Sequence, residues 1–488
     1  MSRSSTALSA TVLVLLVGIS PTVPIALGQC DWATVAGAPG ADDDDFGAAV
    51  ALGGDFAVVG APGDDTEEPD AGAAYVFERF GHGWVQRAKL TAGADAVEGD
   101  RFGAAVALVG DTILVGAAET DLPGKTNAGA AYVFRRDGDA WPPVQRLTAD
   151  DADALDRFGS AVAADSDPVY GDYAVVGAYL AGPLGDSPGA AYVFQRTGDE
   201  WLPDERLTAL AGSTNDFFGR AAAIHLPFII VGADGEDGTD GAAYVFVRGI
   251  ESWSPQIRLF ADDASPFANF GASVAIDFNH AVVGAPRDKN TCPDEDPVTP
   301  CGAAFVYQRT GPVWSGQARL AAGDTHQGQL FGKSVAIDVD TILVGAAEDN
   351  HAGGDSGAAY VFERTAGAWI ERAKLTASDA AAADRFGWAA AVDGEYALVG
   401  AKDDDVGDNE DREGSAYLYR RGAGAWGWTA PSGGFDLIDF GNLQLCFTGE
   451  APPSLSACCT PFDDAGDHDV DTDDLPPFAA ELVGPSPP

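Results

Sequence analysis

The sequence predicts an all-β protein, a seven-bladed β-propeller made of four-stranded antiparallel blades. A pattern of four short features recurs seven times, at intervals of 52 to 61 residues. Each feature alternates large and small apolar residues with the two-residue period of a β-strand. A sheet with two apolar faces cannot bury either face alone, so its neighbours must cover both. Repeats of about 50 residues with four strands each are typical of propellers, whose blades pack face to face around a channel.

The first strand of each repeat is predicted to begin at a Phe-Gly pair. In the segment FGAAVAL, this alternation places Phe46, Ala48, Val50 and Leu52 on a bulky face and Ala49 and Ala51 on a small face. The bulky face of one blade is expected to pack on the small face of its neighbour, with glycines that let the backbones approach. The seven phenylalanines are Phe46, Phe102, Phe158, Phe218, Phe270, Phe331 and Phe386.

The second and third strands are predicted at a Gly-Ala pair and at the segment GAAYVF or a variant of it. Tight corners such as Gly54-Asp55 favour a hairpin between the first two strands. The Gly-Ala pair follows the Phe by fourteen residues, except where an insert at residues 165–170 delays it to nineteen. The glycines of this pair are Gly60, Gly116, Gly177, Gly232, Gly284, Gly345 and Gly400. The third strand starts at Gly72, Gly129, Gly189, Gly241, Gly302, Gly357 and Gly414.

The fourth strand is predicted to follow a tryptophan and, in several repeats, to end in Lys/Arg-Leu-Thr. The seventh repeat lacks this ending after Trp426, whereas the N-terminal segment aligns with the same part of the pattern. We therefore predict that residues 32–36 supply the outer strand of the seventh blade, which closes the ring. The alternative is that residues 426–430 complete this blade. The seven tryptophans are Trp84, Trp141, Trp201, Trp253, Trp314, Trp369 and Trp426.

Composition divides the chain into three segments. Residues 1–28 have an early arginine, an apolar run and a small-residue exit, which is the pattern of a secretory signal peptide. A lipoprotein signal is less favoured, because Gln29 is too large for the position before Cys30. Residues 29–430 form the predicted propeller, and residues 431–488 form an acidic tail. No later stretch reaches the roughly 18 apolar residues of a membrane span, so we expect a protein that is secreted or held at the cell surface.

Acidic residues dominate the charge of the chain. Asp and Glu number 75 against 28 Lys and Arg, which gives a formal net charge of −47. A field of this sign repels phosphate backbones and anionic lipids, so nucleic acid and anionic membranes are poor partners. The acidity fits solubility in a salty medium or a role in cation binding.

The order of Phe-Gly, Gly-Ala and GAAYVF over residues 42–421 resembles the FG-GAP repeat family, which forms the propeller of integrin alpha-chain heads and of many secreted bacterial proteins. The resemblance implies a propeller that serves adhesion or binds protein or glycan at the cell surface, without catalysis. Integrin-type repeats hold calcium in an Asp-rich loop between the first two strands. This link is only a short turn here, so the resemblance does not carry those calcium sites over.

Acidic residues instead cluster in the loops that precede the GAAYVF segments. Ca²⁺ takes about six to eight oxygen ligands, many of them carboxylates. The sequence therefore predicts calcium sites at this rim; the alternative is that these Asp and Asn residues are ordinary turn residues on a solvated surface. The candidate ligands in these loops are Asp64, Asp65, Asp70, Asp234, Glu236, Asp240, Asp403 and Asp405.

Six cysteines fit an exported protein in an oxidising environment. Cys292 and Cys301 bracket the longest rim loop, and we predict a disulfide bond that pins this loop. The remaining four cysteines allow three pairings, and the sequence does not choose among them. They are Cys30, Cys446, Cys458 and Cys459.

The acidic tail resembles a dockerin-type module. The segment FDDAGDHDVDTDD fits an EF-hand-like calcium loop, with ligands at Asp463, Asp467, Asp471 and Asp474. The resemblance implies a docking partner for the tail. Ala465 replaces an oxygen ligand and two prolines interrupt the helix that should follow, so an acidic disordered tail is the alternative.

We expect a monomeric binding or adhesion protein rather than an enzyme. None of the six histidines recurs in register or has the spacing of a catalytic triad or metal site. The variable loops that precede GAAYVF favour their rim as the binding surface. The alternatives are a structural component of the envelope or matrix and, less favoured, a propeller enzyme that acts on polysaccharide.

Overall fold

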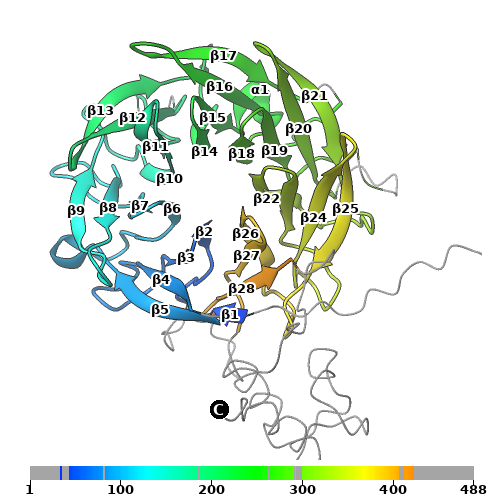
Figure 1. Cartoon of the computed structure of the whole chain (residues 1–488), viewed down its shortest axis with the longest axis horizontal. Coiled ribbons are helices and arrows are strands. Elements are labelled where there is room, and N and C mark those ends of the chain that lie inside the picture. The colour runs from blue at the N-terminus through cyan, green and yellow to red at the C-terminus, as the bar shows by residue number, and fades with distance from the viewer. Residues whose placement is uncertain are drawn as a thin grey trace, which may run out of the picture.

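The computed structural model describes residues 33–35, 43–80, 83–183, 187–210, 212–261, 263–290, 292, 299–405 and 412–421. Seven four-stranded sheets stand around a central axis and form a ring (Figure 1). Every strand pairing within these sheets is antiparallel. The predicted seven-bladed propeller of four-stranded blades is therefore confirmed.

Within a blade, the strands run from the central axis to the outside of the ring (Figure 1). Blades 1 and 2 are β2 (Ala49–Gly53), β3 (Phe56–Ala61), β4 (Ala73–Phe80), β5 (Gly83–Leu90), and β6 (Ala105–Val109), β7 (Thr112–Ala117), β8 (Ala130–Arg135), β9 (Pro143–Leu147). Blades 3 and 4 are β10 (Phe158–Asp167), β11 (Gly171–Ala178), β12 (Ala190–Thr197), β13 (Glu200–Leu207), and β14 (Phe218–His225), β15 (Phe228–Ala233), β16 (Ala242–Arg248), β17 (Trp253–Leu259). Blades 5 and 6 are β18 (Ser273–Asp277), β19 (His280–Ala285), β20 (Ala303–Thr310), β21 (Val313–Leu320), and β22 (Phe331–Asp338), β23 (Thr341–Ala346), β24 (Ala358–Thr365), β25 (Ala368–Leu375). Blade 7 is β26 (Phe386–Asp393), β27 (Tyr396–Ala401), β28 (Ser415–Arg420) and β1 (Ala33–Val35).

Helices are short in the described part of the chain. The α-helix α1 (Glu236–Thr239) lies in the loop between β15 and β16, and a single 3₁₀ turn (Gly93–Asp95) follows β5. No helix among the described residues has the length and apolar character needed to cross a membrane.

The bulky face of each blade packs on the small face of the blade before it. Between blades 1 and 2, Phe102, Tyr132 and Trp141 of blade 2 join Ala74 and Val76 of blade 1 in one buried cluster. The rings of Phe102 and Tyr132 meet edge to face, with their centroids 5.4 Å apart. The predicted division of each sheet into a bulky and a small face is thus confirmed, and it explains why one blade needs the next.

Glycines set the distance between neighbouring blades. A Cβ atom at Gly60 would lie 1.9 Å from the carbonyl oxygen of Gly103 in the next blade, so no side chain fits. Gly103 has a φ of +98°, which also requires the conformational freedom of glycine. The same contact recurs at all seven interfaces, including Gly400 against Gly47 where blade 7 meets blade 1.

The predicted faces of the first strand are confirmed in blade 1, where Phe46, Val50 and Leu52 share one cluster, but the strand also carries a bulge at the Phe-Gly pair that the alternation does not predict. In β10, β14, β22 and β26 the register shifts directly after the phenylalanine, because the following glycine has a positive φ and forms a bulge. In blade 1, β2 begins only at Ala49. Phe46 nevertheless lies on the bulky side, against the rings of Tyr75 and Phe77.

The N-terminal segment closes the ring. Strand β1 pairs antiparallel with β28, with Ala33 opposite Leu418 and Thr34 opposite Tyr417. The prediction that the N-terminus supplies the outer strand of blade 7 is therefore confirmed for residues 33–35. Residues 426–430, the alternative, lie outside the described residues.

A second set of bonds joins the blades at the hairpin end, where the first two strands of each blade turn. A carboxylate at the end of one innermost strand accepts a hydrogen bond from a backbone N–H of the next blade. The four pairs, each at 2.7 Å, are Asp165 with Leu226, Asp277 with Val339, Asp338 with Gly394, and Asp393 with Gly54. The last pair joins blade 7 to blade 1, so it adds to the closure.

Candidate functional site

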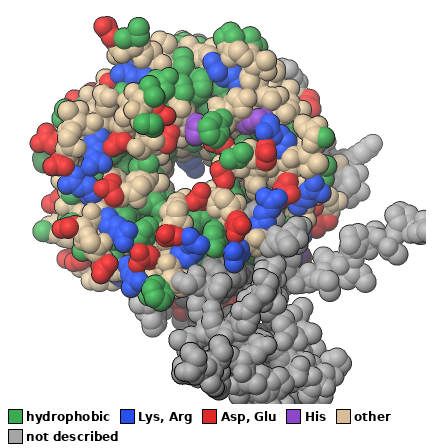
Figure 2. Space-filling model, viewed as in Figure 1, with side chains coloured by type: hydrophobic (Ala, Val, Ile, Leu, Met, Phe, Trp, Pro, Cys, Tyr) green, Lys and Arg blue, Asp and Glu red, His purple; other side chains and the backbone are tan. Residues whose placement is uncertain are grey.

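One end of the ring carries the Phe-Gly pairs, the loops before the GAAYVF segments and the linkers between blades. We call this end the Phe-Gly rim. There the backbone N–H of Phe102 donates to the carbonyl oxygen of Ala71 in the preceding blade (2.9 Å), and Gly72 pairs with Phe102. Figure 2 shows one face of the ring, with an opening at its centre and side chains of both charge signs around it.

A buried acidic side chain follows the Gly-Ala pair in five blades and is held by partners within the blade. In blade 1, Asp64 accepts a hydrogen bond from the Tyr75 hydroxyl (2.6 Å) and pairs with Lys89 Nζ (2.6 Å). Burial alone would raise the pKa of Asp64, but the hydrogen bonds from Lys89 and Tyr75 outweigh it and lower this pKa. The equivalent groups are Glu236 with Tyr244 and Arg258, Asp288 with Arg319, Asp349 with Tyr360 and Lys374, and Asp404 with Tyr417.

Blade 7 keeps this acid but changes its surroundings. Asp404 accepts a hydrogen bond from Tyr417 (2.9 Å), and no ion pair to it is formed within the described residues. The register that places Lys89 and Lys374 opposite the tyrosine in blades 1 and 6 places Thr34 of β1 there in blade 7. Burial therefore raises the pKa of Asp404 to about 6. Because β1 is the outer strand of blade 7, a threonine stands where blades 1 and 6 have a lysine.

The predicted calcium ligands at the rim serve different structural roles. Asp64 and Glu236 belong to the buried groups just described. Three others accept a backbone N–H. Asp65 accepts from Asp70 (2.7 Å) and Asp405 from Arg412 (2.9 Å) within their own loops, and Asp240 accepts from Phe267 (2.9 Å) in the linker that follows β17. Asp403 pairs with Arg385 (2.9 Å) and Lys402 (3.0 Å), and Asp234 lines a pocket.

Calcium at these positions stays a prediction. Over the ranges that the structure describes, no group of three or more His, Cys, Asp or Glu side chains is arranged to hold a metal ion. The four predicted ligands of the tail, Asp463, Asp467, Asp471 and Asp474, lie outside the described residues.

The predicted disulfide bond between Cys292 and Cys301 is confirmed, with Cα atoms 5.5 Å apart. The backbone N–H of Cys301 donates to the carbonyl oxygen of Asp288 (3.2 Å), so the bond fixes the rim loop beside the start of β20. The other four cysteines, Cys30, Cys446, Cys458 and Cys459, lie outside the described residues.

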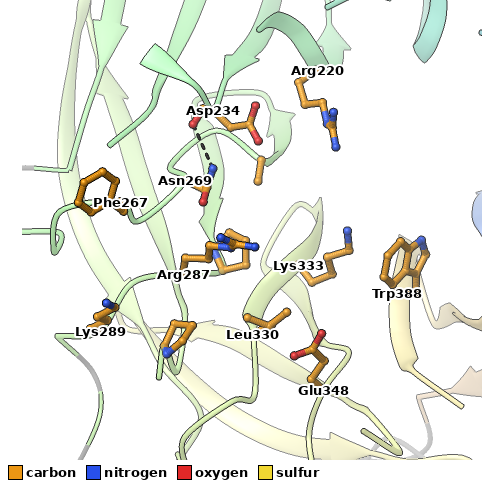
Figure 3. Close-up of a pocket in the computed structure, with 13 residues that line it drawn as sticks. Arg220, Asp234, Phe267, Asn269, Arg287, Lys289, Leu330, Lys333, Glu348 and Trp388 are labelled. Atoms are coloured by element: carbon orange, nitrogen blue, oxygen red, sulfur yellow. Dashed lines mark hydrogen bonds between the residues drawn. The ribbon is translucent and has the colours of Figure 1, made fainter. Parts of the chain in front are cut away.

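A pocket of about 800 Å³ opens at the Phe-Gly rim and is lined by blades 4, 5, 6 and 7 (Figure 3). Four blades contribute the same position to its wall, the residue that follows Phe-Gly: Arg220, Ala272, Lys333 and Trp388. The loops that follow the Gly-Ala pairs add four charged residues: Asp234, Arg287, Lys289 and Glu348. The ring thus brings residues far apart in the sequence to one site.

Lys333 lies against an aromatic ring and other cations. Its Nζ is 3.7 Å from the ring centroid of Trp388, and Nζ of Lys402 is 4.6 Å from the same centroid. Burial, together with the positive charges of Arg220 and Lys402, lowers the pKa of Lys333 to about 8. The charged form of this side chain is therefore poorly compensated inside the pocket.

Asp234 offers an acceptor on the opposite wall of the pocket. Its carbonyl oxygen accepts a hydrogen bond from Asn269 Nδ2 (3.2 Å), drawn in Figure 3. Its side-chain atom Oδ1 is buried and has no hydrogen-bond partner among the described residues. Burial raises the pKa of this carboxyl.

The sequence pattern of the FG-GAP repeat matches seven segments of the chain: residues 34–77, 84–134, 141–194, 201–246, 253–307, 314–362 and 369–419. The chain belongs to the FG-GAP repeat family. Six FG-GAP matches begin in the outer strand of one blade, the third begins two residues before β9, and every match ends in the third strand of the next blade. The first match begins in β1, so the repeat pattern itself includes the strand that closes the ring. A comparison with curated proteins returned no match.

FG-GAP propellers are in general proteins of binding and adhesion, which fits a pocket at the rim. Of the residues that line this pocket, only Asp234 was predicted from the sequence as part of a site, as a calcium ligand. The FG-GAP repeats nevertheless contain a pattern from which three of the pocket residues could have been predicted. The residue after Phe-Gly is Ala or Ser in blades 1, 2, 3 and 5, whereas blades 4, 6 and 7 place Arg220, Lys333 and Trp388 there. Comparing this one register across the repeats singles out these three residues.

Proposed function

We propose that this FG-GAP propeller is exported and binds a protein or glycan at the cell surface through the pocket of its Phe-Gly rim. The observation that carries the proposal is the pocket between blades 4 and 7, whose volume of about 800 Å³ suits a ligand. Its wall combines apolar surface from Phe267, Leu330 and Trp388 with charged groups. This mixture is typical of sites that bind and orient a ligand.

Export is supported by the signal-like N-terminal segment and by the disulfide bond that fixes the rim loop. The role proposed is binding by a monomer, without catalysis. Calcium dependence is part of the proposal, with the tail loop and the exposed rim carboxylates Asp65 and Asp70 as the candidate ligands.

A binding screen on glycan and protein arrays tests this function. Ala272→Trp would fill the pocket at its wall, and Ala104→Trp places the same side chain at the same register in blade 2, away from the pocket. We expect the protein to bind a subset of array ligands, and Ala272→Trp to abolish this binding while Ala104→Trp preserves it.

Two outcomes would contradict the proposal. If both tryptophan variants bind as the original protein does, the pocket is not the recognition site. If no array ligand binds above background, with or without added Ca²⁺, the binding role itself is wrong. Calorimetric titration of Ca²⁺ into chelator-treated protein tests the metal separately, and we expect heat of binding and a higher melting temperature.

A further inference from the structure

The charge of the pocket is opposite to the charge of the chain. Its lining contains four basic residues, Arg220, Arg287, Lys289 and Lys333, and two acidic residues, Asp234 and Glu348. The whole protein has a formal net charge of −47. A local excess of positive charge in so acidic a protein attracts a negatively charged group to this one place on the rim.

Three of the four basic side chains of the pocket are available to a ligand. Arg220, Arg287 and Lys333 form no side-chain hydrogen bond or ion pair with other described residues. Instead, the guanidinium of Arg220 lies 4.7 Å from the ring centroid of Tyr179, and Lys333 lies on Trp388. In Figure 3, Arg220 from blade 4 and Lys333 from blade 6 extend their charged ends toward the same space. An anion in that space would contact both.

The carboxyl of Asp234 adds a second requirement. Its buried Oδ1 lacks a donor among the described residues, and a buried acceptor without a partner is costly. A simple anion such as acetate or sulfate cannot satisfy it, because such an anion brings only acceptors. A ligand that carries both a carboxylate and hydroxyl groups satisfies the cations and Asp234 together.

The size of the pocket and the acidity of the rest of the surface further restrict the class of ligand that can bind. The space of about 800 Å³ accommodates a ring-sized molecule, and Phe267 and Leu330 provide apolar surface for its body. A long polyanion or a peptide with several acidic residues would be repelled by the surrounding charge. A molecule with one carboxylate on a hydroxylated ring avoids that repulsion.

From these contacts we infer that the pocket binds a sugar acid, such as the terminal uronic acid of a glycan. The carboxylate lies between Arg220 and Lys333, and a ring hydroxyl donates to the carboxyl group of Asp234 where it lines the pocket. Arginine suits this role because its guanidinium can donate two parallel hydrogen bonds to a carboxylate. This inference rests on the proposed function, since it names the chemical class of ligand for the same pocket.

Calorimetric titration of the full-length protein tests the inference. The probes are an oligosaccharide that ends in glucuronic acid, the same oligosaccharide ending in glucose, and a short peptide rich in Asp and Glu. We expect the uronic acid probe to bind at least tenfold more tightly than the other two. Lys333→Met should weaken its binding at least tenfold, and Lys125→Met, which removes the same charge from a loop of blade 2, should leave it unchanged.

The melting temperature of Lys333→Met shows that a loss of binding is not a loss of fold, and Arg220→Met serves as a second variant. Equal binding of the uronic acid and glucose probes, preference for the acidic peptide, or full binding by Lys333→Met would overturn the inference. If the protein binds array ligands, Ala272→Trp abolishes that binding and the uronic acid probe does not bind, this inference is wrong but the proposed function is supported. If Ala272→Trp leaves array binding unchanged, the proposed function of the pocket is wrong.

Discussion

At the contacts between blades, single glycine residues decide how closely two sheets can approach. Gly60 stands directly against the backbone of Gly103 in the next blade, and the equivalent pair recurs around the ring. These contacts explain why the sequence repeats Phe-Gly and Gly-Ala rather than a looser apolar pattern. The glycines act through steric exclusion, which periodicity alone does not reveal.

Gly60→Ala should destabilise the protein by about 3 kcal/mol, because the new Cβ would overlap the Gly103 carbonyl oxygen and force blades 1 and 2 apart. Chemical denaturation gives this free energy of unfolding. The control is Gly316→Ala, where a Cβ meets nothing within 4 Å. Equal stability of the two variants would show that the blades can yield at this contact.

We expect Lys333, at its buried position in the pocket, to lower the free energy of unfolding of the protein. Its pKa of about 8 lies below the usual 10.5, so the fold disfavours its charged form. Lys333→Met should therefore raise the free energy of unfolding at pH 7 by about 3 kcal/mol. Above pH 8 the folded protein loses this proton before the unfolded chain does, so the advantage of the variant should shrink and vanish near pH 10.5.

Thermal melting at pH 7, 9 and 10 measures this effect. Lys125→Met is the control, because Lys125 lies in a loop of blade 2 and does not line the pocket. We expect no comparable gain in melting temperature from this variant at pH 7. A Lys333→Met protein that melts below the original protein at pH 7 would show that this side chain is well compensated, contrary to our account.

At the scale of the blade, the tyrosine, the acid and the base form a unit that the sequence contains but that strand periodicity does not reveal. The loop carboxylates were predicted as candidate calcium ligands because composition alone shows clusters of Asp. The structure places Asp64 and Asp349 against Lys89 and Lys374 from the fourth strand, about 25 residues away. Such pairs depend on strand register across the blade, which a reading of one loop at a time misses.

The faces of the strands, the disulfide bond and the closing strand could be predicted from the sequence. They depend on alternation, on the position of two cysteines and on a missing Lys/Arg-Leu-Thr ending, all of which are local. The pocket could not be predicted in the same way. Arg220, Lys333 and Trp388 come from three blades, and only the ring brings them together.

The acids of blades 6 and 7 should respond to pH in opposite ways. Burial would raise the pKa of Asp349, but hydrogen bonds from His351 and Gln329 and the charge of Lys374 lower it well below its usual range. Its stabilising effect is therefore present above about pH 4 and lost as the pH falls. Asp404, whose pKa is raised to about 6, stabilises the fold below about pH 4, and this effect is lost as the pH rises through 6.

Asp349→Asn should accordingly cost about 3 kcal/mol at pH 7, because Lys374 would lose its buried partner. Asp404→Asn should be neutral or stabilising at pH 7. Melting curves of both variants between pH 3 and pH 8 check this. The account is wrong if Asp404→Asn is the more damaging of the two at neutral pH.

The closing strand is the other element whose removal has a definite result. Deleting residues 29–38 removes β1 and leaves β28 as an unpaired edge in blade 7. We expect a melting temperature lower by several degrees and a tendency to associate, detected by size-exclusion chromatography. An unchanged melting temperature and a monomeric elution volume would mean that another segment closes the ring.

At the scale of the whole molecule, the ring makes stability and binding depend on one another. Every blade covers the faces of two neighbours, and the last is joined to the first by Gly400 with Gly47, by Asp393 with Gly54 and by β1. The pocket between blades 4 and 7 exists only because the blades are held at fixed angles around the axis. The central claim is therefore that no subset of blades provides this site.

A fragment of residues 201–421 tests that claim most directly. It contains every residue that lines the pocket, but it exposes the bulky face of blade 4 and the small face of blade 7 and lacks β1. Thermal melting followed by circular dichroism should show no cooperative transition, whereas the full-length protein should melt in a single one. A monomeric fragment that melts cooperatively would contradict the account, because it would show that four blades are stable without the ring.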